Sequence, residues 1–206
     1  TRLDFSLLKR SLTKHSSGLY LLPRPVRLED VSLITPEDLQ RVIGLLKATF
    51  SHLVLDLSKS YSPIDMMAIE MATHVLLVTQ LDLPCLRNVV RLMMSFGEIE
   101  NIAEKVKIVV NRAGLDHGHI TLKKAEETIG KPIFWQLPND YRTMIEVRNN
   151  GVPLVEQFPK AAITQSIVGM AETLTGASID EDQARKAATS SVLGRLFSFG
   201  SSKGGK

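Results

Sequence analysis

The chain has 206 residues, of which 44% are hydrophobic and 23% charged, and its formal net charge is +3. A chain of this length can bury a large core as a single α/β domain. No apolar run reaches the roughly 20 residues of a membrane-spanning helix, and the N-terminal residues lack the apolar segment of a secretory signal peptide. The mild positive charge favours anionic ligands in general and specifies none.

The first 50 residues predict a helix, a short strand and a second helix. Apolar residues over 1–14 have the spacing of a short amphipathic helix. Residues 19–22 form an apolar run closed by Pro23, which is typical of a strand. Thr35-Pro36-Glu37-Asp38 combines an N-cap, a proline at the first helical position and two acids, so we expect a helix from there to about Phe50.

Three bounded apolar runs, at 52–57, 74–79 and 105–111, predict strands that are buried on both faces. Helix-length segments separate them. This alternation is typical of a doubly wound, mostly parallel α/β sheet, in which ligands bind at the carboxyl ends of the strands. Polar residues follow each apolar centre at that edge, namely Asp56, Gln80, Asp82, Asn111 and Arg112.

The remaining elements follow from local signals. We expect helices over 64–72, about 85–96, 121–129, 141–149 and 162–174, and a last strand over 132–137. Gly97 and Gly130 are expected to end their helices. The methionines of the first of these helices, Met66, Met67 and Met71, suit a gap-filling core or a partner surface.

From Ala177 the composition shifts to small and charged residues, so we expect a linker over 177–190 and a basic tail over 191–206. Within the tail, 192–199 could form a short amphipathic segment that contacts a membrane weakly, although two glycines interrupt it. A disordered tail is the simpler expectation.

Asp56 closes the first of the apolar runs and carries two interpretations. A carboxylate at a strand end can hold Mg²⁺ beside a phosphate, directly or through water, because the metal needs hard oxygen ligands. The same carboxylate can equally cap the loop that follows. The sequence alone leaves both open.

Asn111-Arg112 and Pro138-Asn139-Asp140 are two polar turns expected at the same sheet edge. Their amides could hydrogen-bond a base edge, and the Arg112 guanidinium could stack on one. Asn, Asp and Pro are also ordinary turn formers, and from the residues alone this is the simpler explanation.

Several other types of site are missing from the sequence. No G-x-x-x-x-G-K-[ST] phosphate loop follows any predicted strand, and the Gly- and Lys-containing 202–206 has no strand before it. His117 and His119 suit a solvated loop better than a metal site. The single cysteine, Cys85, excludes an internal disulfide, fits a reducing cytoplasm, and suits a helix start better than a nucleophile.

Together these segments resemble the MinD/ParA superfamily of deviant Walker ATPases, and within it the CpaE/TadZ branch that serves Flp (Tad) pilus assembly. The resemblance covers about residues 3–175. It rests on the order and spacing of the segments 17–25, 53–57, 74–84, 87–88, 109–113 and 137–141.

The resemblance implies a nucleotide-binding switch whose ATP and Mg²⁺ bind in the intact parent protein. Asp56 matches the aspartate that lies near Mg²⁺. Asn111 and Arg112 match the turn that reads adenine, and Pro138, Asn139 and Asp140 match the second adenine-side turn. The resemblance supplies no catalytic residue.

The family's lysine-containing phosphate loop would lie upstream of this chain. The resemblance therefore implies that 1–176 is the C-terminal portion of a MinD/ParA-like ATPase domain, followed by the flexible linker and basic tail, 177–206. The loop after Asp56, 58–61, lacks the family's glycine, which argues against hydrolysis even in the parent. Lys59 in this loop could face a phosphate, but a solvated lysine is the simpler expectation.

The resemblance implies a homodimer, pilus-assembly proteins as partners and a cytoplasmic location, with a peripheral contact of 191–199 to the inner membrane as an added alternative. A nucleotide-independent scaffold with a degenerate ATPase fold is the first rival function. A ParA-like partition protein is the second, and it ranks last because the basic residues are scattered among acids rather than clustered, so nucleic acid is not an expected partner.

Overall fold

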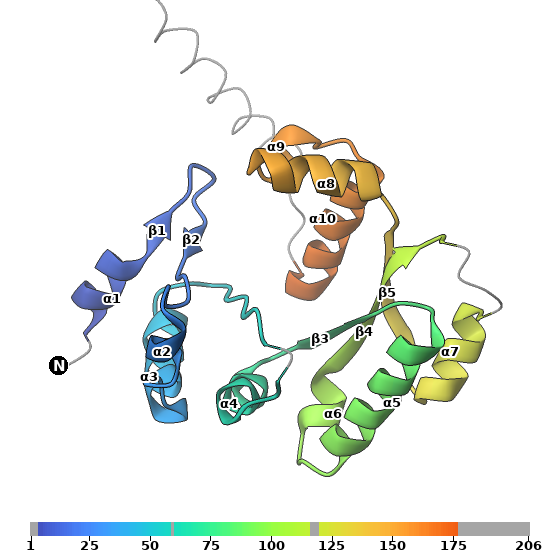
Figure 1. Cartoon of the computed structure of the whole chain (residues 1–206), viewed down its shortest axis with the longest axis horizontal. Coiled ribbons are helices and arrows are strands. Elements are labelled where there is room, and N and C mark those ends of the chain that lie inside the picture. Colours follow the sequence, from blue (N-terminus) through green and yellow to red (C-terminus); the bar gives the residue numbers. More distant parts are fainter. Residues whose placement is uncertain (1–3, 59, 116–119, 177–206) are drawn as a thin grey trace, which may run out of the picture. The chain divides into compact units, whose positions relative to one another are not determined.

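The computed structural model of the chain describes residues 4–58, 60–115 and 120–176 (Figure 1). The chain divides into two compact units, Thr1–Val75 and Leu76–Lys206, and each is described by itself. Among the described residues, no helix combines the length and apolarity that crossing a membrane requires. The predicted linker and tail over 177–206, the pair His117 and His119, and Lys59 lie outside the described residues.

The first unit is mainly helical. Its elements are α1 (Phe5–Ser11), β1 (Thr13–Lys14), β2 (Tyr20–Leu21), α2 (Leu28–Val31), α3 (Pro36–Lys47) and α4 (Pro63–Met71). The strands β1 and β2 form a short antiparallel hairpin. The helices and the short strand expected over 1–50 are therefore confirmed, as is the helix expected over 64–72.

Helices α3 and α4 begin in the same way. In each, a hydroxyl N-cap precedes a proline, and the third helical residue is an aspartate that closes a capping box: Thr35 with Asp38, and Ser62 with Asp65. Each capping box thereby satisfies two backbone N–H groups at the start of its helix without any tertiary contact. The two helices pack together, with Ile43 and Ile69 among their buried residues.

The prediction of a strand over 52–57 is wrong. No strand is assigned to these residues, and the side chain of Val54 is 95% exposed. A strand exists only through hydrogen bonds to a neighbouring strand, and none of the described strands pairs with this run. Apolarity marked a segment that is compatible with a sheet, but it could not supply a partner.

The second unit is an α/β layer structure. Its elements are β3 (Val75–Thr79), α5 (Leu83–Gly97), α6 (Ile102–Lys105), β4 (Val106–Ala113), α7 (Leu122–Ile129), β5 (Ile133–Pro138), α8 (Tyr141–Asn150), α9 (Leu154–Gln157) and α10 (Ala162–Thr175). The strands form a sheet of order β3-β4-β5, in which β4 and β5 are parallel. The predicted α/β class is confirmed.

Strand β4 is the centre of this sheet and of the core. Val106, Ile108, Val109 and Val110 are almost completely buried, as expected for a strand covered on both faces. Helices α5 and α7 lie together on one side of the sheet, and α10 packs on β5 from the other (Figure 1). The core of this unit therefore has the layers that its sequence pattern predicted.

The contact between α10 and β5 is close and partly polar. The Trp135 indole Nε1–H donates to the Ser166 hydroxyl at 3.0 Å, and that hydroxyl donates to the Gln136 carbonyl at 3.0 Å. One turn further along α10, Gly169 faces the Trp135 ring, and an added Cβ would lie 3.3 Å from it. Glycine thus allows the helix to approach the strand closely at this point.

Two element ends differ from the prediction. Gly97 is the last residue of α5, but the C-cap is Glu98, in a right-handed conformation, and not Gly97 itself. The strand expected over 105–111 was predicted to end in a polar turn at Asn111-Arg112, but β4 continues through this turn to Ala113. By contrast, Gly130 ends α7 with φ 75°, as predicted.

The burial of β4 makes a direct prediction about stability. Ile108 is 0% exposed, so Ile108→Ala should lower the free energy of unfolding by about 2–5 kcal/mol, through lost transfer energy and the cavity left behind. The measurement is urea unfolding followed by circular dichroism. Val26, which is 99% exposed, provides the control, because Val26→Ala should change stability by less than about 0.5 kcal/mol. Equal effects of the two substitutions would contradict the assignment of β4 as the core strand.

Candidate functional site

The carboxyl end of β4 is irregular. Its pairing with β5 shifts register between Val110 and Ala113, and Arg112 adopts a left-handed backbone conformation with φ 55°. The Asn111 side-chain carbonyl accepts a hydrogen bond from the Arg112 backbone N–H at 2.9 Å. Such a bond stabilises the turn locally and leaves the NH₂ group of Asn111 to donate elsewhere. The Arg112 side chain is exposed.

The carboxyl end of β5 lies directly beside this turn. Pro138 pairs with Ala113 in the parallel register, and the Asn139 backbone N–H donates to the Ala113 carbonyl at 3.0 Å. The structure therefore brings the two polar turns together at one edge of the sheet. Their role in binding stays a prediction.

The side chains of these turns divide into structural and available groups. Asp140 is the N-cap of α8, and one of its carboxylate oxygens accepts from the Thr143 N–H at 3.2 Å. For Asp140, the turn explanation is thus sufficient. Among the described residues, no hydrogen-bond partner is seen for the amide nitrogens of Asn111 and Asn139 or for the Arg112 guanidinium. This edge consequently offers several donors, one of which is planar and cationic.

Asp56 belongs to the other unit and is exposed. It does not end a strand, because the strand expected over 52–57 is not formed. No cluster of three or more His, Cys, Asp or Glu side chains that could hold a metal ion occurs within the described ranges. A lone carboxylate still suits Mg²⁺, because this ion commonly keeps several waters and takes one or two carboxylates together with substrate phosphates.

The loop after Asp56 is held by a residue that the sequence analysis missed, Asp65. Its carboxylate, 5% exposed, accepts from the Ser58 hydroxyl at 2.6 Å and from the Ser62 hydroxyl at 2.8 Å. It also accepts from the backbone N–H groups of both serines, at 3.1 and 2.8 Å. The signal was present in the sequence, since Ser62-Pro63-Ile64-Asp65 repeats the capping pattern of Thr35-Pro36-Glu37-Asp38.

These four donors set the protonation of Asp65. Burial by itself would raise the pKa of the carboxyl group, but the hydroxyl and backbone donors of Ser58 and Ser62 outweigh burial and hold the pKa at about 2. The ionised form is therefore the one that fixes the loop. Tyr61, within the same loop, has φ 49°, and its pKa is raised by burial and by the charge of Asp65.

Cys85 occupies the first turn of α5 beside the N-cap Asp82, whose carboxylate accepts from the Cys85 N–H at 2.8 Å. Burial raises the pKa of the thiol, and the hydrogen bond and negative charge of Asp82 raise it further. The neutral thiol is a poor nucleophile. The interpretation of Cys85 as a helix-start residue agrees with this position.

Comparison with known proteins identifies the fold. The structure superimposes on a ParA family ATPase from Chlorobium tepidum TLS with a TM-score of 0.75 and 27% identity, covering 84% of this chain and 69% of that one. It superimposes on the septum site-determining protein MinD from Pyrococcus horikoshii OT3, solved with Mg-ADP, with a TM-score of 0.69 and 23% identity, covering 81% of this chain and 68% of that one.

The sequence comparison agrees. The septum site-determining protein MinD of Thermotoga maritima is 25% identical over 177 residues, which is 82% of this chain and 63% of the relative. This chain thus spans less than two thirds of the length of that relative. No family model matches it. The chain is similar to MinD/ParA P-loop ATPases in sequence and in structure, and it has their α/β fold.

The hydrogen bonds to Asp65 predict a pH-dependent contribution to stability. Because folding lowers this pKa from 3.8 to about 2, the ionised carboxylate stabilises the fold above pH 3.8, by roughly 2 kcal/mol, and the contribution is lost as the pH falls through 2. Asp65→Asn should therefore be less stable than the native chain at pH 6, and the difference should shrink toward pH 2. Denaturant unfolding of both proteins across this range measures it.

The serine donors provide the control for this prediction. Ser58→Ala removes the shorter hydroxyl bond to Asp65, so it should weaken the pH dependence without abolishing it. A stability difference between the native chain and Asp65→Asn that stays constant from pH 6 to pH 2 would refute the assigned role of the carboxylate.

Proposed function

We propose that this chain is part of a nucleotide-binding switch domain of the MinD/ParA type, in which binding of ATP, rather than its turnover, sets the state that partners recognise. The observation that carries the proposal is the pair of turns at the carboxyl ends of β4 and β5, held together by the bond from Asn139 to Ala113. In sheets of this class, that edge is where ligands bind.

The chemistry of the two turns suits a purine base. The amides of Asn111 and Asn139 can donate to ring nitrogens or carbonyl groups, and the Arg112 guanidinium can stack on a flat ring. Pro138 fixes the backbone at the end of β5, and Asp140 fixes the start of α8. In this proposal Asn111, Arg112 and Asn139 contact the base, whereas Pro138 and Asp140 position the turn.

Asp56 is proposed as the carboxylate that lies near Mg²⁺, through a water molecule. The ion, when bound, would neutralise charge on the phosphates. The sequence holds no G-x-x-x-x-G-K-[ST] motif, so we propose that the main phosphate contacts come from a part of the protein outside this chain. Residues 1–176 then form the C-terminal portion of the ATPase domain, followed by the linker and tail, 177–206.

The finer assignment is a CpaE/TadZ-type protein that acts in Flp (Tad) pilus assembly or localisation. It rests on the resemblance of the segments quoted above, and it includes a homodimer, pilus-assembly partners and a cytoplasmic location. A weak contact of 191–199 with the inner membrane is an optional part of this proposal.

A nucleotide-independent scaffold is the second candidate, and one observation favours it. The segment that follows Asp56 has no glycine, and Asp65 holds Ser58 and Ser62 of this segment by four hydrogen bonds. A loop anchored in this way is poorly suited to rearrange around a γ-phosphate. This observation argues against hydrolysis more strongly than against binding.

Calorimetry of ATP with Mg²⁺ tests the proposal, on the protein extended upstream to its natural start. The native protein should bind saturably, and Asn111→Ala should weaken binding by about tenfold, because one hydrogen bond to the base is lost. Asn149→Ala is the matched control, since Asn149 is exposed on α8 and lies outside both turns. A well-folded protein that binds no ATP would leave the scaffold as the working function.

Asp56→Asn tests the metal assignment separately. In the presence of Mg²⁺ the variant should bind ATP more weakly than the native protein, whereas in EDTA the two should bind equally, because the carboxylate acts through the ion. The same loss of affinity with and without Mg²⁺ would show that Asp56 has another role.

A further inference from the structure

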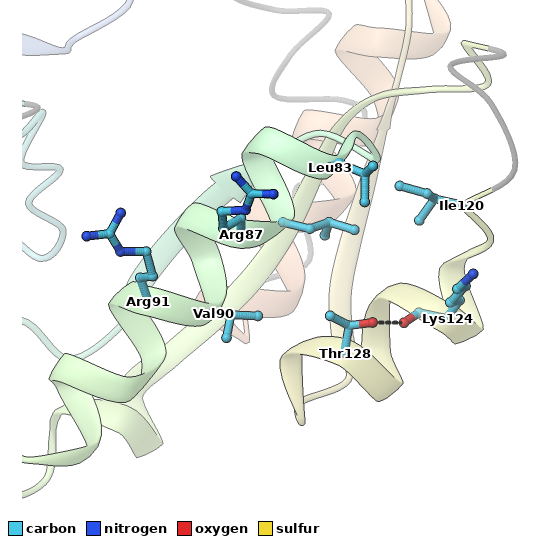
Figure 2. Close-up of a pocket in the computed structure, with 8 residues that line it drawn as sticks. Leu83, Arg87, Val90, Arg91, Ile120, Lys124 and Thr128 are labelled. Carbon is cyan, nitrogen blue, oxygen red and sulfur yellow. Dashed lines mark hydrogen bonds between the residues drawn. The ribbon is translucent and has the colours of Figure 1, made fainter.

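A groove of about 350 Å³ lies between helices α5 and α7 of the second unit (Figure 2). Its lining comes from α5, from α7 and from the residue that leads into Thr121, the N-cap of α7: Leu83, Leu86, Arg87, Val90, Arg91, Ile120, Lys124 and Thr128. None of these residues belongs to the two turns of the candidate nucleotide site.

The inside of the groove is apolar. Leu86 and Val90 of α5 belong to its lining, and Leu86 is buried. Ile120 lies opposite Leu83 (Figure 2). The Thr128 hydroxyl donates to the Lys124 carbonyl within α7 at 2.6 Å, so it needs no further partner (Figure 2). Leu83 is 69% exposed at the mouth of the groove. Leu83 thus extends the apolar lining to the surface, and a continuous apolar patch with a polar rim is typical of an interaction site.

The rim of the groove is cationic. Arg87 and Arg91 are four residues apart on α5 and so lie on one face of it, and Lys124 stands on the α7 side (Figure 2). No acidic residue lines the groove, and α5 contains none. Among the described residues, no side-chain hydrogen bond or salt bridge is seen for these three cations. Their charge is thus available to a ligand that enters the groove.

We propose that this groove docks an acidic amphipathic helix of another protein. The apolar face of such a helix would cover Leu83 and Val90, in the helix-in-groove mode of peptide recognition. Its Asp and Glu residues, on either side of the apolar stripe, would pair with Arg87 and Arg91 on one side and Lys124 on the other. Complementary charge at a rim increases the association rate and selects among partners.

Charge argues against the other occupants. The tail of this chain, 191–206, carries Arg195, Lys203 and Lys206 and no acid, so the rim would repel it. A second copy that presented the same α5 face would set arginines against arginines. A nucleic acid would match the cations but would leave Leu83 and its apolar neighbours uncovered. The acidic helix satisfies both the apolar floor and the cationic rim, and it does so independently of the proposed nucleotide site.

Two designed peptides test the proposal on the full chain. The first is a short amphipathic helix with leucines on one face and glutamates on either side of them, and the second has lysine in place of every glutamate. Fluorescence anisotropy should show saturable binding of the glutamate peptide, at least about tenfold tighter than that of the lysine peptide, and it should weaken as salt is added.

Charge reversal in the rim sharpens the test. The double substitution Arg87→Glu and Arg91→Glu should lower the affinity for the glutamate peptide by at least about tenfold and should raise the affinity for the lysine peptide. The control pair Arg148→Glu and Lys160→Glu changes the net charge equally on exposed residues outside the groove, and it should bind like the native chain. Lys124→Glu repeats the test from the opposite wall, in case the α5 pair misfolds.

The outcomes separate the proposal from its rivals. Reversed peptide preference in the rim variants, with native circular dichroism, supports it. No saturable binding of the glutamate peptide below about 1 mM, equal binding of both peptides, or equal effects of the rim and control pairs would overturn it. Tighter binding of a duplex DNA fragment than of the glutamate peptide would overturn it as well.

Discussion

The parallel pairing of β4 with β5 is the contact on which the rest of the second unit depends. It buries the valines and the isoleucine of β4, it provides the surface on which α10 packs through Trp135, and it ends in the bond between Asn139 and Ala113. Because β4 and β5 are parallel, their carboxyl ends, and the turns that follow them, lie at the same edge of the sheet. The two polar turns are therefore neighbours as a result of the pairing itself, and no separate contact has to assemble them.

Local signals predicted most of the elements correctly. Thr35 with Pro36 at the start of α3, and Gly130 at the end of α7, are short-range features, and the structure uses each of them as predicted. A cap or a left-handed glycine acts on its own helix alone, so the sequence contains all the information that is needed. The position of the two polar turns in the second unit was also predicted correctly, because two parallel strands that each end in a turn place both turns at the same sheet edge.

The failures share a physical cause. Residues 52–57 have the composition of a buried strand, but a strand depends on a partner that can lie anywhere in the chain, and apolarity does not name it. The strand was predicted to end in the polar turn at Asn111-Arg112 because the apolar residues stop at Val110, whereas the irregular register carries the pairing on to Ala113. The capping box of Asp65 with Ser62 is a local pattern that the sequence contains, whereas its bonds to Ser58 are shown only by the folded loop.

Strand β3 has a consequence for handling the protein. Within the described sheet it has a neighbour on one side only, and Leu76 and Val78 are exposed along its length. Its five residues include no lysine or proline, which are among the residues that usually prevent an outer strand from pairing with another molecule. We expect this edge, taken within the described sheet, to be a place where another strand can pair, and a lysine in place of Val78 would be the first solubilising substitution to introduce.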